Sequence, residues 1–384
     1  MIIFAISFFL LVLAYFTIEY QLLKTRLKKI PIRIMVNGTR GKSTTVKIIY
    51  EILRLEKQKV FAKTTGEKPL QYLPNGINKT ILRISPASIL ENIRILRKWA
   101  HESPDSVVME CMALQPETQF ILSNRIFQPN YILITNILVD HAEVMGQNVG
   151  EITETILECL HPKAEIFMNE NQLNGFFASE DLPNLHRIAS TDTFPERMDH
   201  IPSDILDQNW TLIKNFTHHL KIDLQTTFQC FKKEWARISK DIYLRIPDLN
   251  ISIWNLFSVN DTQSTNLFIQ HSRDELPQNS QEIILLNTRK DRPLRTKLFA
   301  EFLNREFKSA NIWITGTGRQ LGRNQFKREG VEANLISLKS YGAILEELKA
   351  GYPVPTTIYC LANFNGMEHF IKSIQELKKF YQKN

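Results

Sequence analysis

The sequence predicts an α/β protein with a parallel sheet, a smaller C-terminal α/β domain and one N-terminal transmembrane helix. Three observations predict it. Short apolar or β-branched runs alternate with helical segments over residues 31–160, and a shorter alternation of the same kind comes after residue 260. The chain also begins with an uncharged apolar run. Alternating strands and helices are typical of a parallel sheet that is covered on both faces.

The N-terminal run, Ile2 to Ile18, contains no charged residue. As a helix it would cover roughly 25 Å at about 1.5 Å per residue, slightly less than the ~30 Å hydrocarbon core of a bilayer. A cleaved signal peptide fits poorly, because no positive charge precedes the run and no small-x-small site comes after it. A buried core helix is the other alternative. We expect a membrane anchor over residues 1–20.

The next segment is basic. Residues 20–33 contain no acid and include Lys24, Arg26, Lys28, Lys29 and Arg33. These five account for most of the net charge of +7, so the chain has no general excess of charge for a nucleic acid, and we expect no nucleic-acid partner. The cluster favours a cytoplasmic location for the residues on its C-terminal side. We expect a basic juxtamembrane linker at 21–30 and a single-pass protein of the cell membrane with its catalytic part in the cytoplasm.

The elements after the linker are predicted from these patterns. Strands are expected near 32–36, 59–64, 106–110 and 131–136, and helices near 42–56, 86–101 and 149–160. Asn169–Asp204 is rich in Asn, Asp, Ser and Pro and predicts a loop. Later we expect a strand at 282–287, a helix at 293–306, a strand at 311–315, a last strand from Tyr359 to Phe364 and a lysine-rich helix from Glu368. The four cysteines form no C-x-x-C pair, which indicates neither disulfides nor a cysteine zinc site.

Residues 37–44 lie between the first strand and its helix and predict a phosphate loop. Gly38 and Gly41 allow a turn whose N–H groups face an anion at the helix N-terminus. Lys42 can reach the β- and γ-phosphates of ATP, and Ser43 is placed to bind Mg²⁺. The general pattern Gly-x-x-x-x-Gly-Lys-Ser/Thr would need glycine where Val36 stands. A chance Gly-Lys-Ser turn is the alternative.

Two later strands end in residues that are able to bind a metal. Glu110 comes directly after Ser106–Met109, and carboxyl ends of parallel strands are where ligands bind in open α/β sheets. Asp140 and His141 come after Tyr131–Asn136. A carboxylate suits Mg²⁺, whereas histidine is an unusual ligand for it. Taken singly, a solvent-facing glutamate and a hydrogen-bonded loop histidine are the more common outcomes.

The joint pattern resembles the Mur ligases and folylpolyglutamate synthases. It consists of Gly-Thr-x-Gly-Lys-Ser, a strand that ends in Glu, and Thr-Asn-x-x-x-Asp-His. The resemblance implies a Mur-type P-loop fold for residues 31–255 and a reduced C-terminal domain at 256–384. It also implies that ATP converts a carboxylate into an acyl phosphate, which an amine then attacks to form an amide. The nucleotide would be bound by Asn37, Gly38, Thr39, Arg40, Gly41, Lys42, Ser43, Thr44 and Asn136.

The same resemblance assigns further roles. Lys42, Glu110 and His141 would be catalytic, Ser43 and Glu110 would hold one Mg²⁺, and His141 would help to hold a second. Asn136 and Asp140 would shape the loop. Many Mur ligases carry a carbamylated lysine after the histidine loop, but residues 155–160 contain no lysine. Either Glu158 would supply the negative charge, or the second metal would be bound differently.

Further motifs narrow the resemblance to poly-γ-glutamate synthase subunits of the PgsB/CapB type. They are Asn37–Ser43 with arginine at position 40, Phe61–Gly66, Glu110–Ala113, Asn255–Asp261 and Asn287–Arg292. This resemblance implies glutamate and a poly-γ-glutamate chain as substrates, with small membrane proteins as partners. Arg289 and Arg292 would be catalytic residues that pair with an anionic group. A solvated loop is the alternative for them.

Two other functions remain open from the sequence. One is a ligase of the same chemistry that acts on another amino acid, with a peptidoglycan or folate-like acceptor. The other is a membrane-tethered P-loop switch that signals through its nucleotide state and forms no bond. The motifs are dense over residues 31–150 and patchy over 250–320, and no motif is found between 165 and 245.

Overall fold

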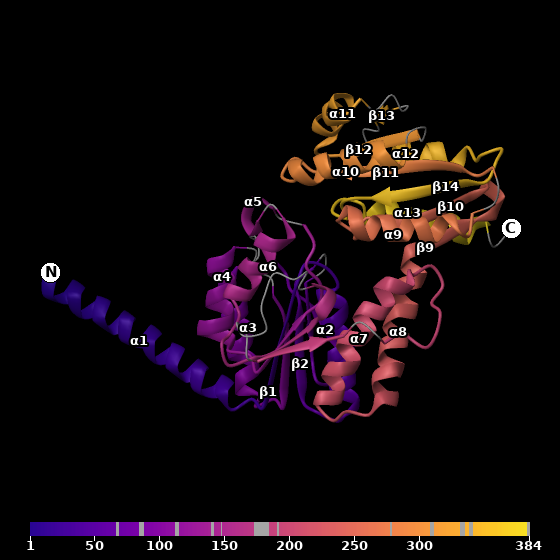
Figure 1. Ribbon diagram of the computed structural model, residues 1–384. Helices are drawn as coiled ribbons and strands as arrows, with labels where there is room; N and C mark the ends of the chain where they lie inside the picture. The colour runs from indigo at the N-terminus through magenta and orange to yellow at the C-terminus, as the bar shows by residue number, and fades with distance from the viewer. Residues whose placement is uncertain are drawn as a thin grey trace. The chain divides into compact units, whose positions relative to one another are not determined.

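The chain folds into two units, each built around its own sheet (Figure 1). The first unit contains Met1–Thr193 and Asp207–Phe231, and the second contains Phe194–Leu206 and Lys232–Asn384. The computed structural model describes residues 1–66, 69–83, 88–111, 115–139, 142–146, 148–172, 184–189, 192–276, 279–307, 311–330, 335–337 and 341–381. The predicted boundary between residues 255 and 256 lies inside the second unit, because the strands just before it pair with the second sheet.

The first sheet has the order β4-β3-β2-β5-β1-β6-β7-β8. Its strands are β1 (Ile32–Asn37), β2 (Val60–Thr64), β3 (Leu70–Tyr72), β4 (Asn78–Thr80), β5 (Ser106–Glu110), β6 (Tyr131–Ile134), β7 (Glu165–Asn169) and β8 (Leu185–Ile188). The six strands β2, β5, β1, β6, β7 and β8 are parallel to one another. β3 and β4 are antiparallel and form one edge of the sheet. The chain goes from β1 to one side of the sheet and later returns to the other side, so the end of β1 lies at a switch point, where α/β sheets bind ligands.

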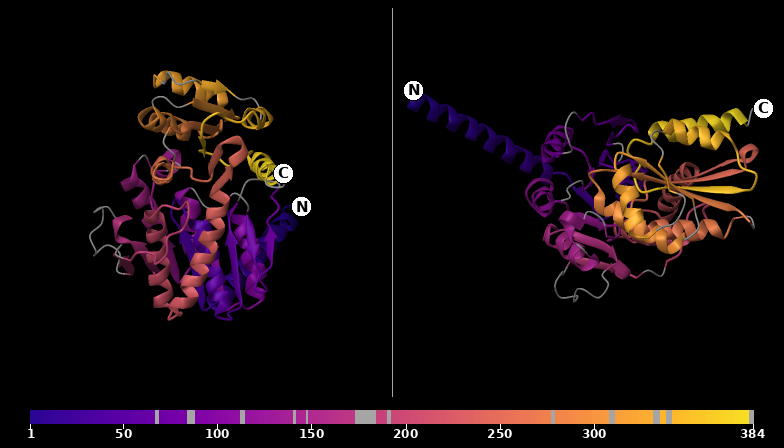
Figure 2. Two further views of the ribbon diagram at one scale, coloured as in Figure 1. Left: turned by 90° about the vertical axis from the view of Figure 1, so that its right-hand side faces the viewer. Right: turned by 90° about the horizontal axis from the view of Figure 1, so that it is seen from above.

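Helices cover both faces of this sheet (Figures 1 and 2). The helical segments up to residue 242 are α1 (Ile2–Lys28), α2 (Lys42–Leu55), α3 (Ile89–His101), α4 (Pro116–Phe120), the π-helical η1 (Ile121–Phe127), α5 (Ala142–Met145), α6 (Val149–Glu158), the short η2 (Glu170–Gln172), α7 (Ser203–His219) and α8 (Leu224–Ile242), and α8 continues from the first unit into the second. One face packs on α3, η1, α6 and the end of α1, and there Trp99 stacks on Phe61 with ring centroids 5.3 Å apart. On the other face, Phe216 of α7 packs edge-on against Tyr131 and Phe167.

The second sheet has the order β13-β12-β11-β14-β10-β9, parallel except for β9. Its strands are β9 (Tyr243–Ile246), β10 (Ile251–Leu256), β11 (Gln281–Thr288), β12 (Asn311–Gly316), β13 (Leu335–Ser337) and β14 (Thr356–Leu361). The helical segments are η3 (Pro247–Leu249), α9 (Thr262–Arg273), α10 (Pro293–Glu306), α11 (Arg319–Arg328), α12 (Tyr341–Lys349) and α13 (Glu368–Tyr381). Its central strands are continuous apolar runs such as Ile283–Leu286, as expected for strands buried on both faces.

Most predicted elements are present within a few residues of their expected bounds. The helix at 293–306 matches α10, and the strand at 282–287 corresponds to β11. The helix expected at 86–101 is α3, with residues 84–87 outside the described part. The loop expected over Asn169–Asp204 is wrong in part, because this range contains η2, β8 and the first residues of α7. Four residues at a sheet edge, among polar neighbours, give too short a pattern to indicate a strand.

Helix α1 continues well beyond the apolar run and packs onto the first unit at its end. It spans 27 residues, it is long and apolar enough to cross a membrane, and its most apolar window is not buried in the protein. Leu23 and Leu27 are buried in the core beside α3 and η1. The Tyr20 hydroxyl donates to the Arg125 carbonyl at 2.8 Å, and Arg97 pairs with Glu19. Residues 21–28, expected as part of a linker, are therefore helical. Leu23 and Leu27 among them are packed in the core of the first unit.

Arg33 differs from the other members of the basic cluster, because it is buried. Its Nε donates to the Gln128 carbonyl at 2.9 Å, and its Nη1 donates to the carbonyl groups of Ile30 at 2.6 Å and Leu27 at 3.3 Å. Burial lowers the pKa of this guanidinium. Arg33 thus ties the end of α1 to the sheet and is not available to a lipid surface, contrary to its assignment to the juxtamembrane charge.

We expect Arg33→Met to destabilise the first unit. The change removes the donor that these carbonyls share, and losing hydrogen bonds to a charged group in a buried site costs about 2–3 kcal/mol. Thermal unfolding of the full chain in detergent measures the effect. Lys28→Met, at an exposed position on α1, is the matched control and should leave the melting temperature almost unchanged. Equal melting temperatures for the two variants would contradict the role of Arg33.

Candidate active site

The phosphate loop lies at the carboxyl end of β1, between the ends of β5 and β6. Gly38 has a φ of +119°, and a Cβ there would lie 2.5 Å from Thr135 Oγ1 and 2.7 Å from the Asn136 carbonyl oxygen. Only glycine fits such a close approach at positive φ. Gly41, with φ +77°, is the N-cap of α2 and brings no side chain to its first amides. The first amides of a helix have no partner within the helix itself, and an anion is one of the groups that can satisfy them.

Lys42 begins α2 and reaches back over the loop. Its Nζ donates to the Gly38 carbonyl at 2.6 Å and to the Thr39 carbonyl at 3.1 Å. The ammonium group is therefore held beside the loop that leads into the first amides of α2. A positive charge and a helix N-terminus at one place favour a phosphate group. The structure thus places Gly38, Gly41 and Lys42 together in one loop, as an anion-binding role would require.

Glu110 meets the second residue of α2. The Ser43 hydroxyl donates to Glu110 Oε2 at 2.7 Å, and the Thr65 backbone N–H donates to the same oxygen at 2.7 Å. Glu110 is only 4% exposed. Gly66 lies close to this pair, since a Cβ there would be 2.9 Å from Ser43 Oγ. The ends of β1, β2 and β5 therefore bring a hydroxyl and a carboxylate together next to Lys42, and these oxygen donors suit Mg²⁺.

Three of the predicted nucleotide-binding residues shape the loop through contacts within the protein. Asn37 is buried, and its Oδ1 accepts the Gly38 N–H at 2.8 Å. Asn136 accepts the Arg40 N–H on its side-chain oxygen at 2.7 Å and the Thr39 N–H on its carbonyl at 2.8 Å. The Thr39 hydroxyl accepts the Leu138 N–H at 3.0 Å. Thr44 comes after Ser43 in the first turn of α2.

A buried ion pair supports the strand that ends beside Glu110. Lys63 in β2 is fully buried, and its Nζ lies 2.7 Å from Glu91 Oε1 and also donates to Asn92. Arg83 binds Glu91 through two hydrogen bonds, of 2.7 and 2.9 Å. Burial lowers the pKa of Lys63 against the opposing effect of Glu91. Burial alone would raise the pKa of Glu91, but the hydrogen bonds from Arg83 and Lys63 outweigh it and hold that pKa at about 2.

We expect Glu91→Gln to lower the unfolding free energy by about 3 kcal/mol at neutral pH, because it leaves the buried Lys63 ammonium without its counter-charge. The pKa of Glu91 is depressed, so its contribution is complete above the ordinary value of 4.5 and is lost as the pH falls toward 2. Thermal melting from pH 7 to pH 3 should show the difference between wild type and variant shrinking below pH 4.5. The exposed Glu102→Gln is the control. A difference in melting temperature between wild type and Glu91→Gln that stays constant with pH would contradict this account.

The remaining predicted residues are Arg289, Arg292, Asp140 and His141. Arg289 and Arg292 come after β11 at the carboxyl edge of the second sheet, in the second unit. Arg289 forms a two-point ion pair with Asp291, at 3.0 and 2.6 Å, which lowers the pKa of that carboxyl. Arg292 is the N-cap residue of α10. Asp140 and His141 lie outside the described residues.

Several residues that build this site are not predicted from the sequence. Lys63 and Thr65 belong to the motif Phe61–Gly66, which carries no assigned role, and Thr135 precedes the predicted Asn136 without a role of its own. The Thr135 hydroxyl donates to the Arg40 carbonyl and so fixes the loop from the next strand. A lysine inside an apolar strand is the one available signal for Lys63, whereas Glu91 belongs to a helix that carries no motif.

Comparison with known proteins agrees with this geometry. Residues 36–194 match the family model of the Mur ligase middle domain, and residues 245–377 match that of the poly-gamma-glutamate synthase CapB C-terminal domain. By these matches the chain contains a Mur ligase middle domain and a CapB-type C-terminal domain. The resemblance predicted from the loop and strand-end motifs is thereby confirmed.

Curated relatives of this chain come from two Bacillus species. It is 25% identical over 375 residues to the PGA synthase CapB of Bacillus subtilis (strain 168), a match that covers 91% of this chain and 91% of the relative. It is 27% identical over 292 residues to the capsule biosynthesis protein CapB of Bacillus anthracis, a match that covers 73% of this chain. The chain spans 62% of the length of that relative.

Solved structures confirm the fold. The bifunctional folylpolyglutamate synthase/dihydrofolate synthase of Yersinia pestis, complexed with AMPPNP and a Mn ion, superposes with a TM-score of 0.60. The match covers 94% of this chain and 92% of that chain at 11% identity, which shows the fold alone. The Mur-type α/β fold predicted from the sequence is confirmed. Family and fold together support an ATP-dependent amide ligase.

Proposed function

We propose that this CapB-type chain is an ATP-dependent amide ligase that extends poly-γ-glutamate. The observation that carries the proposal is the hydrogen bond between Ser43 and Glu110 beside Lys42, in a chain whose second unit matches the CapB C-terminal domain. A phosphate loop that is paired with a strand-end carboxylate is suited to phosphoryl transfer, and the CapB match supports the choice of substrate.

The proposed reaction has two steps. A γ-carboxylate oxygen of the polymer end attacks the γ-phosphorus of ATP, the bond to the β–γ bridging oxygen breaks, and ADP leaves. The amine of the next glutamate then attacks the acyl carbon of the resulting acyl phosphate. Phosphate departs with the electrons of the carbon–oxygen bond, the nitrogen releases a proton, and an amide remains. Lys42 and the first amides of α2 would offset the negative charge of the transferring group.

The donors around the loop fit Mg²⁺. The Ser43 hydroxyl and the Glu110 carboxylate offer oxygen atoms 2.7 Å apart, and oxygen ligands are those that Mg²⁺ prefers. When bound with ATP, Mg²⁺ would supply charge neutralisation at the phosphates. His141 remains a proposed ligand of a second metal ion by resemblance alone. The guanidinium groups of Arg289 and Arg292 suit an anion, and we propose the polymer end or the ATP phosphates as that anion.

We further propose a membrane location. Helix α1 meets the length and hydropathy needed for a single span, and a basic segment comes at its C-terminal end. By the positive-inside bias, the N-terminus would face outward and both units would lie in the cytoplasm, where ATP is present. Small membrane proteins are the expected partners of such a synthase, and glutamate is the expected small substrate.

Product analysis tests the substrate. Membranes that contain the full chain and its partners receive ATP, Mg²⁺ and either labelled D-glutamate or labelled L-glutamate. We expect labelled γ-linked polymer and one ADP released per amide formed. Absence of polymer with either enantiomer would overturn the proposed substrate, and a panel of other amino acids would then identify a ligase of different specificity.

The same experiment separates the ligase from a nucleotide switch. A ligase consumes ATP in proportion to the amide formed, so ADP release should depend on the amino acid. A switch should hydrolyse ATP without any amino acid and exchange binding partners when it does. ATP hydrolysis that is independent of glutamate, with no product, would therefore contradict bond formation.

A further inference from the structure

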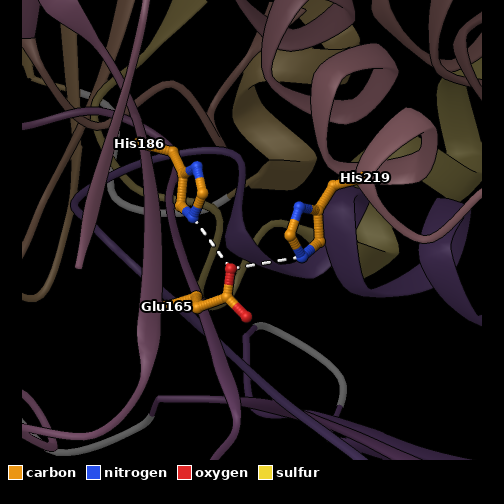
Figure 3. A group of neighbouring side chains, drawn as sticks. All are labelled: Glu165, His186 and His219. Carbon is orange, nitrogen blue, oxygen red and sulfur yellow. Dashed lines mark hydrogen bonds and ion pairs between the residues drawn. The ribbon is translucent and has the colours of Figure 1, made fainter.

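Three side chains of types that can bind a metal ion meet at the edge of the first sheet opposite the phosphate loop. Glu165 is the first residue of β7, His186 is the second residue of β8, and His219 is the last residue of α7 (Figure 3). The two strands are parallel, so these side chains lie near their amino ends. The phosphate loop comes after the carboxyl end of β1 in the same sheet. This Glu165–His186–His219 cluster is therefore separate from the nucleotide site.

The spacing of the donor atoms suits a small cation. His186 Nε2 lies 2.8 Å from Glu165 Oε2, and His219 Nε2 lies 3.2 Å from the same oxygen. One ligand atom from each residue lies within 4.8 Å of the other two. Around a tetrahedral zinc ion with bonds of about 2.0–2.1 Å, donor atoms are about 3.4 Å apart. Small movements of the three side chains would therefore admit the ion.

Aromatic packing orients both imidazoles. The His186 ring stacks on Phe167, with centroids 4.4 Å apart and an interplanar angle of 6°. The His219 ring meets the same phenylalanine edge-on at 5.2 Å and Tyr131 at 5.8 Å. Rings that are held by packing lose less freedom when they bind an ion, and ligands held in this way are a feature of built sites.

We propose that Glu165, His186 and His219 form a binding site for a zinc-like divalent cation. Two imidazole nitrogens and one carboxylate oxygen are donors that zinc accepts readily, whereas Mg²⁺ prefers oxygen alone. The side chains are between 33% and 41% exposed, so solvent reaches the cluster and can provide a fourth ligand. Glu165 would offset part of the charge of the ion.

The bound cation would stabilise the edge of the first sheet that β8 forms. β8 has four residues and, within the described part of the chain, pairs only with β7. A short edge strand of this kind has few backbone hydrogen bonds. A cation shared by Glu165, His186 and His219 would join β7, β8 and the end of α7. The alternative is a metal-free cluster in which both imidazoles share one carboxylate oxygen by hydrogen bonding alone.

Cobalt and zinc titrations distinguish these cases. The full chain is purified in detergent, stripped with a chelator and titrated with Co²⁺ in excess Mg²⁺, which occupies all-oxygen sites. We expect visible absorption of a nitrogen- and oxygen-ligated Co²⁺ that saturates at one ion per chain and is displaced by Zn²⁺. His186→Gln and His219→Gln should each weaken binding more than about 100-fold, since even residues behind the ligands contribute 10–100-fold. His218→Gln, a neighbour on α7, should bind as wild type does.

A stability measurement completes the test. Zn²⁺ at a hundredfold excess over its Kd should raise the melting temperature of the wild-type chain by about 5 °C. Zn²⁺ should not raise the melting temperature of Glu165→Gln, a variant that keeps the shape of the side chain. No saturable Co²⁺ signal in the wild-type chain would overturn the proposal. A signal that all three ligand variants retain would also overturn it, because the ion would then bind elsewhere.

Discussion

Lys42→Met is expected to abolish nearly all ATP-dependent amide formation while leaving the fold intact. The Lys42 ammonium lies 2.6 Å from the Gly38 carbonyl, over the proposed phosphate loop. Methionine keeps most of the length of the side chain but removes the charge that would neutralise the transferring phosphoryl group. Removing one preorganised electrostatic donor costs about 10²–10³-fold in kcat. Glutamate-dependent ADP release from membranes measures this loss.

The exposed Lys98→Met on α3 is the matched control and should keep wild-type activity. Nucleotide protection against thermal unfolding should fall in the Lys42 variant alone, because the lost charge also contributes to ATP binding. A tethered switch with the same change would be locked in one partner-binding state. Near-normal amide formation by Lys42→Met would contradict the placement of ATP at this loop.

Glu110→Gln is the second large change that we expect. The carboxylate is buried and accepts hydrogen bonds from Ser43 and Thr65, each at 2.7 Å. An amide of the same shape can still accept these bonds, but it has no negative charge to hold Mg²⁺. Activity should fall about 10²-fold, and the Mg²⁺ concentration that gives half-maximal activity should rise. Titration of Mg²⁺ in the ADP-release assay measures both effects.

Glu154→Gln, on the exposed side of α6, provides the control for a simple change in charge. It should leave the Mg²⁺ dependence unchanged. If Glu110→Gln lowered activity without any change in Mg²⁺ dependence, the carboxylate would be a support for the Thr65 turn and not a metal ligand.

Local patterns predict the part of the site that depends on register and chain order. A Gly-Thr-x-Gly-Lys-Ser loop after a strand fixes Lys42 and Ser43, and the rule that parallel strands share a carboxyl edge brings Glu110 to them. The contact between Lys63 and Glu91 is not predictable in the same way, since a lysine in an apolar strand is a signal for Lys63 alone and nothing in the helix identifies Glu91 as its partner. β8 escapes prediction because four residues carry too little periodicity.

The second unit shows the same contrast between features that local patterns predict and features that depend on tertiary contacts. Its central strands are predicted from apolar runs, but the sequence places β9 and β10 in the first domain, since pairing with β14 is a contact between distant segments. Arg289 is predicted as a site residue from the motif Asn287–Arg292, and the structure pairs it with Asp291 two residues later. Which partner a side chain meets depends on tertiary contacts that a linear pattern does not contain.

The packing of α1 onto the first unit has a mechanical consequence. Because Leu23, Leu27 and the Tyr20 hydroxyl hold the last turns of the helix on this unit, a twist of the helix turns the nucleotide-binding loop with it. Each residue inserted before Glu19 would rotate the exposed half by about 100° and lengthen it by about 1.5 Å. In the proposed membrane location, a partner helix that contacts α1 would therefore set the direction in which the loop faces around the axis of α1.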